Sequence, residues 1–263
     1  MNEHYYLYAL THAGCRLDSL GPGVDHRFPV ELVCGTQTAA VASRVGLDQF
    51  DVRRLERDST DVDWLSHVAL RHNQVISDVF EQWPLLPLRM AALFNSRLSL
   101  LARMQQWEPI VVDFLNSIGD GQEWAAKIYV DSRQADESLA ASCDVSRLAA
   151  TDAGSGTQYL TRIRNQRRKS RALKDRSLET VAEIETSLMN QTDRYYRSRP
   201  LPSNVTGRRE KMLWNAAFLL PRSACERWLA SVEKLRTAAA AEGLLLETSG
   251  PWPPYHFCPA LES

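Results

Sequence analysis

The chain has 263 residues, 44% of them hydrophobic and 24% charged, a length and composition that allow it to bury a large core. Its formal net charge of −1 at pH 7 excludes a strongly basic or strongly acidic protein. The charge is uneven, however, because residues 1–120 carry 15 acidic and 10 basic side chains and residues 121–263 carry 17 and 21. Opposite charges on the two halves can steer association, although a solvated surface is the commoner explanation.

The five cysteines and the amino-terminal sequence bear on the compartment. No Cys-x-x-Cys pair occurs, one cysteine is left over from any pairing, and the first residues lack a basic segment before an apolar one. These features indicate a reduced, cytoplasmic protein. No apolar run approaches the roughly 20 residues that a membrane-spanning helix needs, so we expect no membrane partner.

The first half predicts a small mixed sheet covered by helices, forming an α+β domain over residues 1–120. Apolar side chains at i, i+3, i+4 and i+7 indicate the helices, and short aromatic or β-branched runs indicate the strands. The expected elements are a strand at 5–10, a hairpin of 28–34 and 38–44, a helix capped by Asp61 that ends at Trp83, an edge strand at 85–88, and a helix at 96–118 with a kink at Pro109.

The second half, residues 121–263, predicts a ferredoxin-like domain. Its elements follow the order β-α-β-β-α-β, which is the split βαβ arrangement. The expected strands are 124–130, 201–205, 212–220 and 244–248, with a long helix at 159–194 and another helix at 221–241. Residues 134–156 interrupt this order as a partly helical insertion, and Gly119-Asp120-Gly121 separates the two domains.

A stiff aromatic tail closes the chain, in the octapeptide Gly250-Pro251-Trp252-Pro253-Pro254-Tyr255-His256-Phe257. Its prolines exclude a helix and remove the amide donors that a central strand needs. We therefore expect an extended tail. Trp252 and Tyr255 should pack onto the second domain, because exposed aromatic side chains would form a sticky patch.

No local pattern supports catalysis, metal binding or cofactor binding. The six histidines form no metal-ligand spacing, and Gly154-Ser155-Gly156 lacks the rest of a phosphate-binding loop, so an entry loop is the simpler interpretation. Glu123 and Lys127 at the start of a strand suggest an edge ion pair rather than acid-base chemistry. We therefore expect no catalytic residue, no metal and no cofactor, and hence no enzyme.

A basic segment is the strongest charge feature. Residues 162–176 hold eight cationic side chains against one acidic side chain, Asp175. A solvated helix is the simplest explanation, and a protein-docking surface or a nucleic-acid contact are alternatives. Aromatic side chains do not interleave with the cations, which weakens the nucleic-acid alternative.

Several motifs taken together resemble the gas vesicle protein F/L family (GvpF/GvpL). They are the tyrosine-rich first strand, Asp63-Trp64-Leu65, Pro87-Leu88-Arg89, Glu123-Trp124 with Lys127, and Gly250-Pro251-Trp252-Pro253-Pro254-Tyr255. The resemblance covers nearly the whole chain. Met90-Ala91-Ala92 departs from the aromatic-Gly-small sequence more usual after Pro-Leu-Arg, and Phe218 stands where family members often have tyrosine.

What the resemblance implies is a minor, non-enzymatic gas vesicle protein. It would bind the small hydrophobic shell subunit, act with other accessory proteins in gas vesicle nucleation and assembly, and limit aggregation of the subunit. No membrane, nucleic acid or small-molecule substrate is expected as a partner. Candidate contacts are Arg89 and the basic side chains Arg167, Arg168 and Arg171, and the structural motif residues are Trp124, Trp252, Pro253, Pro254 and Tyr255. The alternative is a ferredoxin-like module that binds nucleic acid through residues 162–176.

Overall fold

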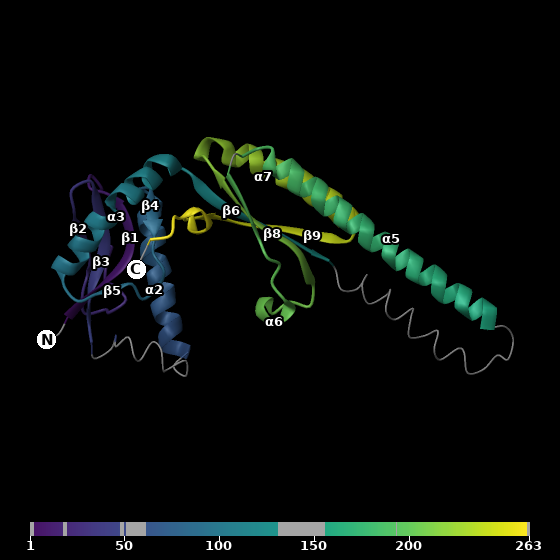
Figure 1. Ribbon diagram of the computed structural model, residues 1–263, viewed down its shortest axis with the longest axis horizontal. Helices are drawn as coiled ribbons and strands as arrows, with labels where there is room; N and C mark the ends of the chain where they lie inside the picture. Colours follow the sequence, from purple (N-terminus) through teal and green to yellow (C-terminus); the bar gives the residue numbers. More distant parts are fainter. Residues whose placement is uncertain are drawn as a thin grey trace. The chain divides into compact units, whose positions relative to one another are not determined.

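A computed structural model describes residues 3–17, 20–47, 50, 62–130, 156–192 and 194–261. The chain divides into two compact units, of which unit 1 comprises residues 1–123 and 251–263 and unit 2 comprises residues 124–250 (Figure 1). The backbone therefore passes from one unit to the other twice. Residues 134–155 of the insertion predicted at 134–156, and Asp61, lie outside the described residues.

Unit 1 contains an antiparallel sheet with the strand order β2-β3-β1-β4, and β5 also pairs with β1. β1 pairs with β3 from Glu3 opposite Gly46 to His12 opposite Thr38, with an irregularity between Leu7 and Ala9. The strands are β1 (Glu3–His12), β2 (Val30–Cys34), β3 (Thr38–Gly46), β4 (Leu85–Pro87) and β5 (Leu93–Phe94). The predicted first strand, hairpin and edge strand are confirmed.

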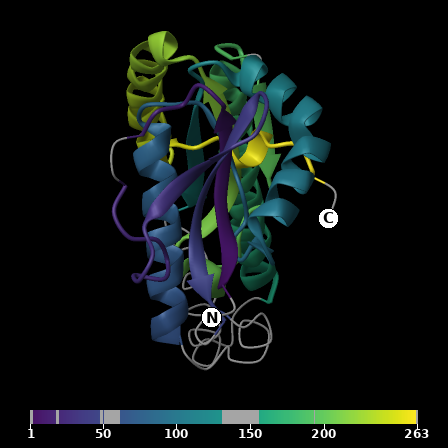
Figure 2. The ribbon, with the colours of Figure 1, turned by 90° about the vertical axis from the view of Figure 1, so that its left-hand side faces the viewer.

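The helices α2 (Val62–Phe80) and α3 (Arg97–Ile118) cover the sheet of unit 1 (Figure 2). Tyr6 and Tyr8 of β1 pack with the apolar side of α2, and the methyl group of Met104 on α3 lies close to Gly35, beyond the end of β2. Because helices pack on both faces, β1 and β3 are buried along nearly their whole length. α3 begins as predicted, since Ser96 and Ser99 each accept a hydrogen bond from the backbone N–H of the other, and Pro109 lies inside the helix.

Unit 2 has the β-α-β-β-α-β order that was predicted. Its sheet order is β7-β8-β6-β9, the arrangement of a split βαβ unit. The elements are β6 (Gln122–Val130), α5 (Gly156–Met189), β7 (Arg194–Ser198), α6 (Ser203–Thr206), β8 (Lys211–Leu220), α7 (Arg222–Ala241) and β9 (Leu244–Trp252). The first residues of β6 and the last residues of β9 belong to unit 1.

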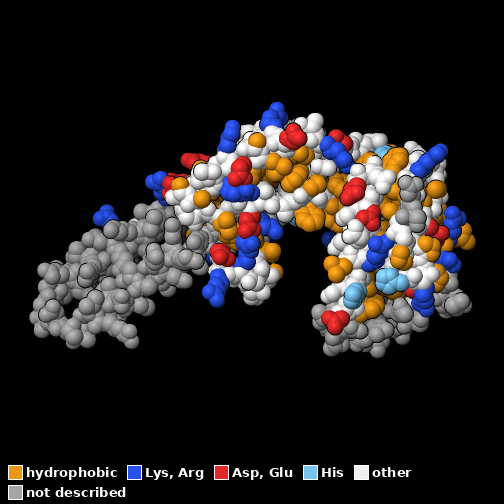
Figure 3. All heavy atoms as spheres, turned by 180° about the vertical axis from the view of Figure 1, so that it is seen from behind, with side chains coloured by type: hydrophobic (Ala, Val, Ile, Leu, Met, Phe, Trp, Pro, Cys, Tyr) orange, Lys and Arg blue, Asp and Glu red, His pale blue; other side chains and the backbone are white. Residues whose placement is uncertain are grey.

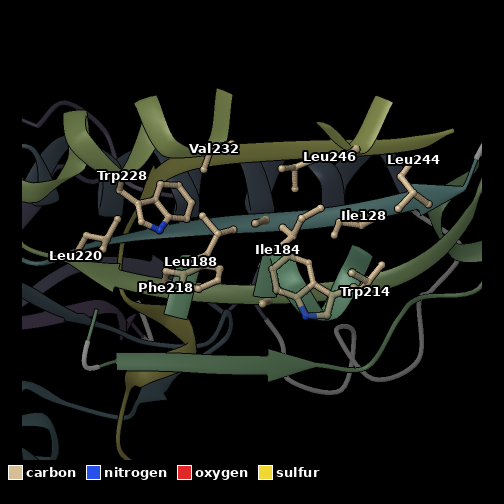
Figure 4. Close-up of a cluster of buried hydrophobic side chains, with 14 of the residues drawn as sticks. Ile128, Ile184, Leu188, Trp214, Phe218, Leu220, Trp228, Val232, Leu244 and Leu246 are labelled. Atoms are coloured by element: carbon tan, nitrogen blue, oxygen red, sulfur yellow. The ribbon is translucent and has the colours of Figure 1, made fainter. Parts of the chain in front are cut away.

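The core of unit 2 lies between the sheet and the two long helices (Figure 4). Trp214 and Phe218 of β8 point toward α5 and α7, where Trp228 and Leu188 are also buried. Alternate residues of β8 share one face of the strand, which explains why Trp214, Phe218 and their neighbours meet the helices together. The half-buried Trp124 packs against this core, with its ring centroid 6.2 Å from that of Trp228.

One predicted strand of unit 2 and the predicted end of one helix are wrong. The strand expected at Leu201–Val205 is instead a loop that leads into the short helix α6, and the strand that pairs with β8 is β7 at Arg194–Ser198. Prolines at 200 and 202 cannot donate to a ladder, whereas Tyr195 and Tyr196 favour a strand. α5 consequently ends at Met189 rather than Arg194.

The placement of the carboxy-terminal tail is also corrected. Residues 251–263 belong to unit 1 rather than to the second domain, and a 3-10 turn at Tyr255–Phe257 interrupts the extended chain. Trp252 is 46% exposed and Tyr255 is 41% exposed, whereas Pro253 and Pro254 are buried. The buried residues of the tail are thus the prolines, which lose little conformational entropy on burial, and not the two aromatic residues.

Candidate protein-binding site

A buried polar cluster in unit 1 joins β1 and α2 to the turn between β4 and β5. The Tyr6 hydroxyl lies 3.0 Å from Nδ1 of His72, and Nε2 of His72 lies 3.2 Å from the backbone oxygen of Leu88. A carbonyl oxygen only accepts, so Nε2 carries the proton. Nδ1 of the neutral ring therefore accepts the hydrogen of the Tyr6 hydroxyl.

The same tyrosine also fixes the far side of that turn. The backbone N–H of Ala91 donates to the Tyr6 oxygen at 3.2 Å. Burial raises the pKa of Tyr6 and lowers the pKa of His72, so both side chains stay neutral near pH 7. The Tyr6–His72 pair thus presents one donor and one acceptor to the turn at Leu88 and Ala91.

The turn at residues 88–92, which we call the PLR turn, is further tied to β1. The backbone N–H of Leu88 donates to the backbone oxygen of Tyr8 at 2.8 Å, and the backbone N–H of Leu7 donates to the backbone oxygen of Ala92 at 2.9 Å. Ala91 has a φ of 72°, which costs a residue with a side chain about 1 kcal/mol. A glycine at this position would adopt that φ without cost.

Arg89 lies at the exposed edge of the PLR turn. Its guanidinium makes no ion pair with any residue that the structure describes. The backbone that carries Arg89 is held by hydrogen bonds at Leu88 and at Ala91. A carboxylate or carbonyl of a partner can therefore bind the guanidinium without the cost of ordering the turn. The predicted contact residue Arg89 is therefore presented to solvent.

The loop at residues 20–28 is held by a second group of polar contacts next to the first. The N–H of Val24 donates to the Tyr8 hydroxyl, which also lies 2.8 Å from Oγ of Ser43. Asp25 accepts hydrogen bonds from Arg27 and from the N–H of Gly46, and these outweigh the effect of burial and lower its pKa. This group is structural, and it fixes the position of the Tyr8 ring beside His72, at a centroid distance of 5.7 Å.

The tail is anchored in unit 1 by a buried carboxylate. Glu123 is 2% exposed and accepts hydrogen bonds from the backbone N–H of His256 at 2.9 Å and from its Nδ1 at 2.6 Å.

The expected ion pair between Glu123 and Lys127 is wrong, because residues four apart on a strand lie about 13 Å from each other. Burial, and to a smaller extent the charge of Glu123, raise the pKa of the Cys258 thiol to about 12. The thiol therefore stays protonated and donates to the backbone oxygen of Pro254 at 3.1 Å.

The basic segment lies in unit 2, on α5. Arg168 and Arg171 are exposed, as is Arg164, whereas the side chain of Arg167 lies outside the described part. On the coloured part of the face drawn in Figure 3, Lys and Arg side chains are interspersed with Asp and Glu. Arg89 and the α5 arginines thus belong to separate units and form no single site within either of them.

Sequence reasoning missed the Tyr6–His72 pair and the Glu123–His256 anchor. The partners are 66 and 133 residues apart, respectively, and no spacing rule connects them. Among the described residues, no group of three His, Cys, Asp or Glu side chains could hold a metal ion, and no helix has the length and apolarity to cross a membrane.

An α+β protein of two units, the second of them ferredoxin-like, is the class that this architecture defines. Comparison with known proteins gives the family. The model of the family described as gas vesicle synthesis protein GvpL/GvpF matches residues 4–259, and the chain belongs to this family.

Curated relatives and solved structures agree with this assignment. The chain is 27% identical to gas vesicle protein L of Streptomyces sp. (strain CB03234), over 96% of this chain and 91% of that one, and 26% identical to gas vesicle protein L2 of Halobacterium salinarum, over 77% and 74%. Crystal structures of GvpF from Anabaena sp. PCC7120 and from Microcystis aeruginosa share the fold, with TM-scores of 0.70 and 0.66 at 17% and 15% identity. Each alignment covers 98% of this chain and 99% of the solved one.

Proposed function

We propose that this gas vesicle protein binds the small hydrophobic shell subunit, limits its self-association and supports gas vesicle nucleation and assembly in the cytoplasm. Membership of the GvpL/GvpF family supports a role in gas vesicle formation. The role is stoichiometric binding rather than catalysis, it needs no cofactor, and other gas vesicle accessory proteins take part in it. An apolar subunit that is held by a binding partner has less surface available for aggregation.

The observation that carries the proposal is the exposed Arg89 on the PLR turn. Tyr6 and His72 hold this turn through their hydrogen bonds with the backbone of Ala91 and Leu88. A preorganised turn loses little conformational entropy when a partner docks, and arginine is enriched where proteins contact one another. The PLR turn is therefore our candidate contact for the shell subunit.

Co-expression with the shell subunit tests the binding. The wild-type chain should co-purify with the subunit and raise its soluble fraction several-fold. Arg89→Glu should lower the recovered subunit, because a carboxylate would replace the cation at the contact. Arg97→Glu is the matched control, because Arg97 is also an exposed arginine of unit 1 but lies outside the turn.

The outcomes separate the possibilities. If the subunit aggregates equally with and without the wild-type chain, the binding function is wrong although the family assignment stands. If Arg89→Glu and Arg97→Glu reduce recovery equally, only net charge matters and the PLR turn is not the contact. Arg168→Glu with Arg171→Glu, in the same assay, tests the second expected contact, and salt-sensitive retention of RNA by the wild-type chain would favour the nucleic-acid alternative.

A further inference from the structure

α5 is much longer than the part of it that packs in unit 2. The helix has 34 residues, and among its side chains that the structure describes, the buried ones are Val181, Ile184 and Leu188, all in the last third. Arg176, which pairs with Glu242 at the end of α7, marks the start of the packed part. The preceding residues 156–175 form a helical arm that extends beyond α7 and the sheet of unit 2 (Figure 1).

Charged side chains follow one side of this helix and change sign along it. Arg164, Arg168 and Arg171 are exposed and fall within about 60° of arc at 3.6 residues per turn. Asp175 and Glu179 are also exposed and continue the row on the same side, within about 80° in total. The side is therefore basic toward the amino terminus of α5 and acidic toward the packed part.

The arm on its own contains repulsive contacts. Arg168 lies four residues after Arg164 and three before Arg171, a spacing at which like charges destabilise an isolated helix. None of the three forms an ion pair with a residue in the described part of the chain. A partner that supplies carboxylates along the same side of the helix would remove this repulsion.

We propose that the partner is a second copy of this chain, with the two α5 helices packed antiparallel about a two-fold axis. In this arrangement Arg171 lies level with Asp175 of the second copy, and Arg168 lies level with Glu179 of the second copy. The two-fold axis repeats each pair. Parallel helices would instead place arginine against arginine, and this excludes the other orientation.

Two features select a second copy as the occupant. The acidic residues that match the arginines stand on the same helix at nearly the same spacing, so the surface is complementary to itself. Leu178, 48% exposed, lies on this side and would gain apolar burial from the contact. The contact does not use Arg89, so it goes beyond the proposed function.

Sedimentation equilibrium of the full chain tests the proposal. A contact along one helix is small, so we expect a weak, concentration-dependent dimer whose dissociation constant rises with ionic strength. Arg168→Glu with Arg171→Glu should weaken it about tenfold or more, because each pair becomes repulsive. The control is Arg227→Glu with Lys234→Glu, at two exposed positions on α7. It changes the net charge by the same amount and should leave the dissociation constant of the dimer unchanged.

Mixing two variants gives the decisive result. Asp175→Arg with Glu179→Arg should weaken the dimer to the same extent, whereas an equimolar mixture with Arg168→Glu/Arg171→Glu should form a heterodimer, since every pair in the mixture has opposite signs. A wild-type chain that stays monomeric at all concentrations and at low salt overturns the proposal. The proposal is also overturned if Arg168→Glu/Arg171→Glu leaves the dissociation constant unchanged, or if the mixture of the two variants stays monomeric. The proposed function survives each of these results, because it rests on co-purification of the shell subunit.

Discussion

The two units bury different kinds of side chain. Within the described residues, all the buried polar or charged side chains belong to unit 1, and they are Thr11, Asp25, Thr38, Ser43, His72 and Glu123. The core of unit 2 consists of aliphatic and aromatic side chains and Cys225, and the indole N–H groups of Trp124 and Trp228 have no hydrogen-bond partner in the described part. Hydrogen bonds are directional and apolar contacts are not, so unit 1 fixes particular segments whereas unit 2 mainly gains stability from burial.

In unit 1, each polar group holds a different surface segment. Asp25 and Tyr8 hold the loop at 20–28, His72 and Tyr6 hold the PLR turn, and Glu123 holds the tail. In unit 2 the long helices need only an apolar side to pack, which leaves the amino-terminal arm of α5 free to extend. The difference teaches that the contact proposed for unit 1 depends on a rigid turn, and the contact proposed for unit 2 depends on an exposed helix.

The largest expected effect tests the apolar core of unit 2. Trp214→Ala, at a side chain that is 0% exposed, should lower the free energy of unfolding by about 3 to 5 kcal/mol. Trp252→Ala is the matched control and should have a much smaller effect, because Trp252 is 46% exposed. Denaturant unfolding followed by circular dichroism measures both, and equal losses would show that the tail indole is as important as the core one.

A smaller effect should follow from breaking the polar cluster of unit 1. Tyr6→Phe removes one hydroxyl and leaves the N–H of Ala91 and Nδ1 of His72 without partners, a cost of about 2 kcal/mol. Tyr5→Phe, on the same strand and half-buried, should change stability by less than about 0.5 kcal/mol. Faster amide exchange at the PLR turn should accompany the first change, and unaltered exchange there would mean that the hydroxyl does not hold the turn.

The tail anchor should contribute less, because its histidine is partly exposed. His256→Ala removes the 2.6 Å contact with Glu123 but keeps the backbone N–H that the carboxylate also accepts, so we expect a loss of about 1 kcal/mol. Hydrogen exchange should rise in peptides of unit 1 and stay constant in β8. His67→Ala, an exposed position on α2, provides the control. A rise confined to unit 2 would contradict the assignment of the tail to unit 1.

The smallest effect is the dependence of unit 1 stability on pH. Burial lowers the pKa of His72 below its usual 6.5, so the unfolded chain binds a proton at a higher pH than the folded chain. Stability is therefore complete above about pH 6.5 and falls as the pH drops toward the folded pKa, by at most about 1.4 kcal/mol per pH unit. Urea unfolding at pH 7.5 and 5.5 measures this, and His72→Gln should flatten the difference. If the free energy of unfolding of His72→Gln depends on pH as strongly as that of the wild type, another group causes the dependence.

Local patterns predicted most elements, because strands and helices in this chain keep their apolar side chains on one side. The sequence of α7 has the expected periodicity over Pro221–Ala241, and the helix occupies Arg222–Ala241. The strand predicted at Leu201–Val205 is wrong. Pro200 and Pro202, which cannot donate to a sheet, are stronger evidence against a strand there than Leu201 and Val205 are for one. Helical periodicity alone also could not show that α5 stops before Tyr195, a residue with high strand propensity.

The candidate site was less predictable than the fold. Arg89 came from the resemblance of Pro87-Leu88-Arg89 to a family motif, and no rule of local spacing would have selected it. The Tyr6–His72 and Glu123–His256 contacts join distant segments, so they depend on tertiary packing that a single sequence does not display. A carboxylate in an apolar strand such as Glu123-Trp124-Ala125 nevertheless signals a buried charge that needs a donor.

The return of the tail to unit 1 affects how the protein is made. Synthesis proceeds from the amino terminus, so Glu123 is completed long before His256, with residues 124–250 still to be added between them. At usual rates of translation this interval lasts about 10 s. Unit 1 therefore emerges from the ribosome with its Glu123 carboxylate lacking the donors of the tail, and it reaches its final structure only after the sequence of unit 2 has been translated.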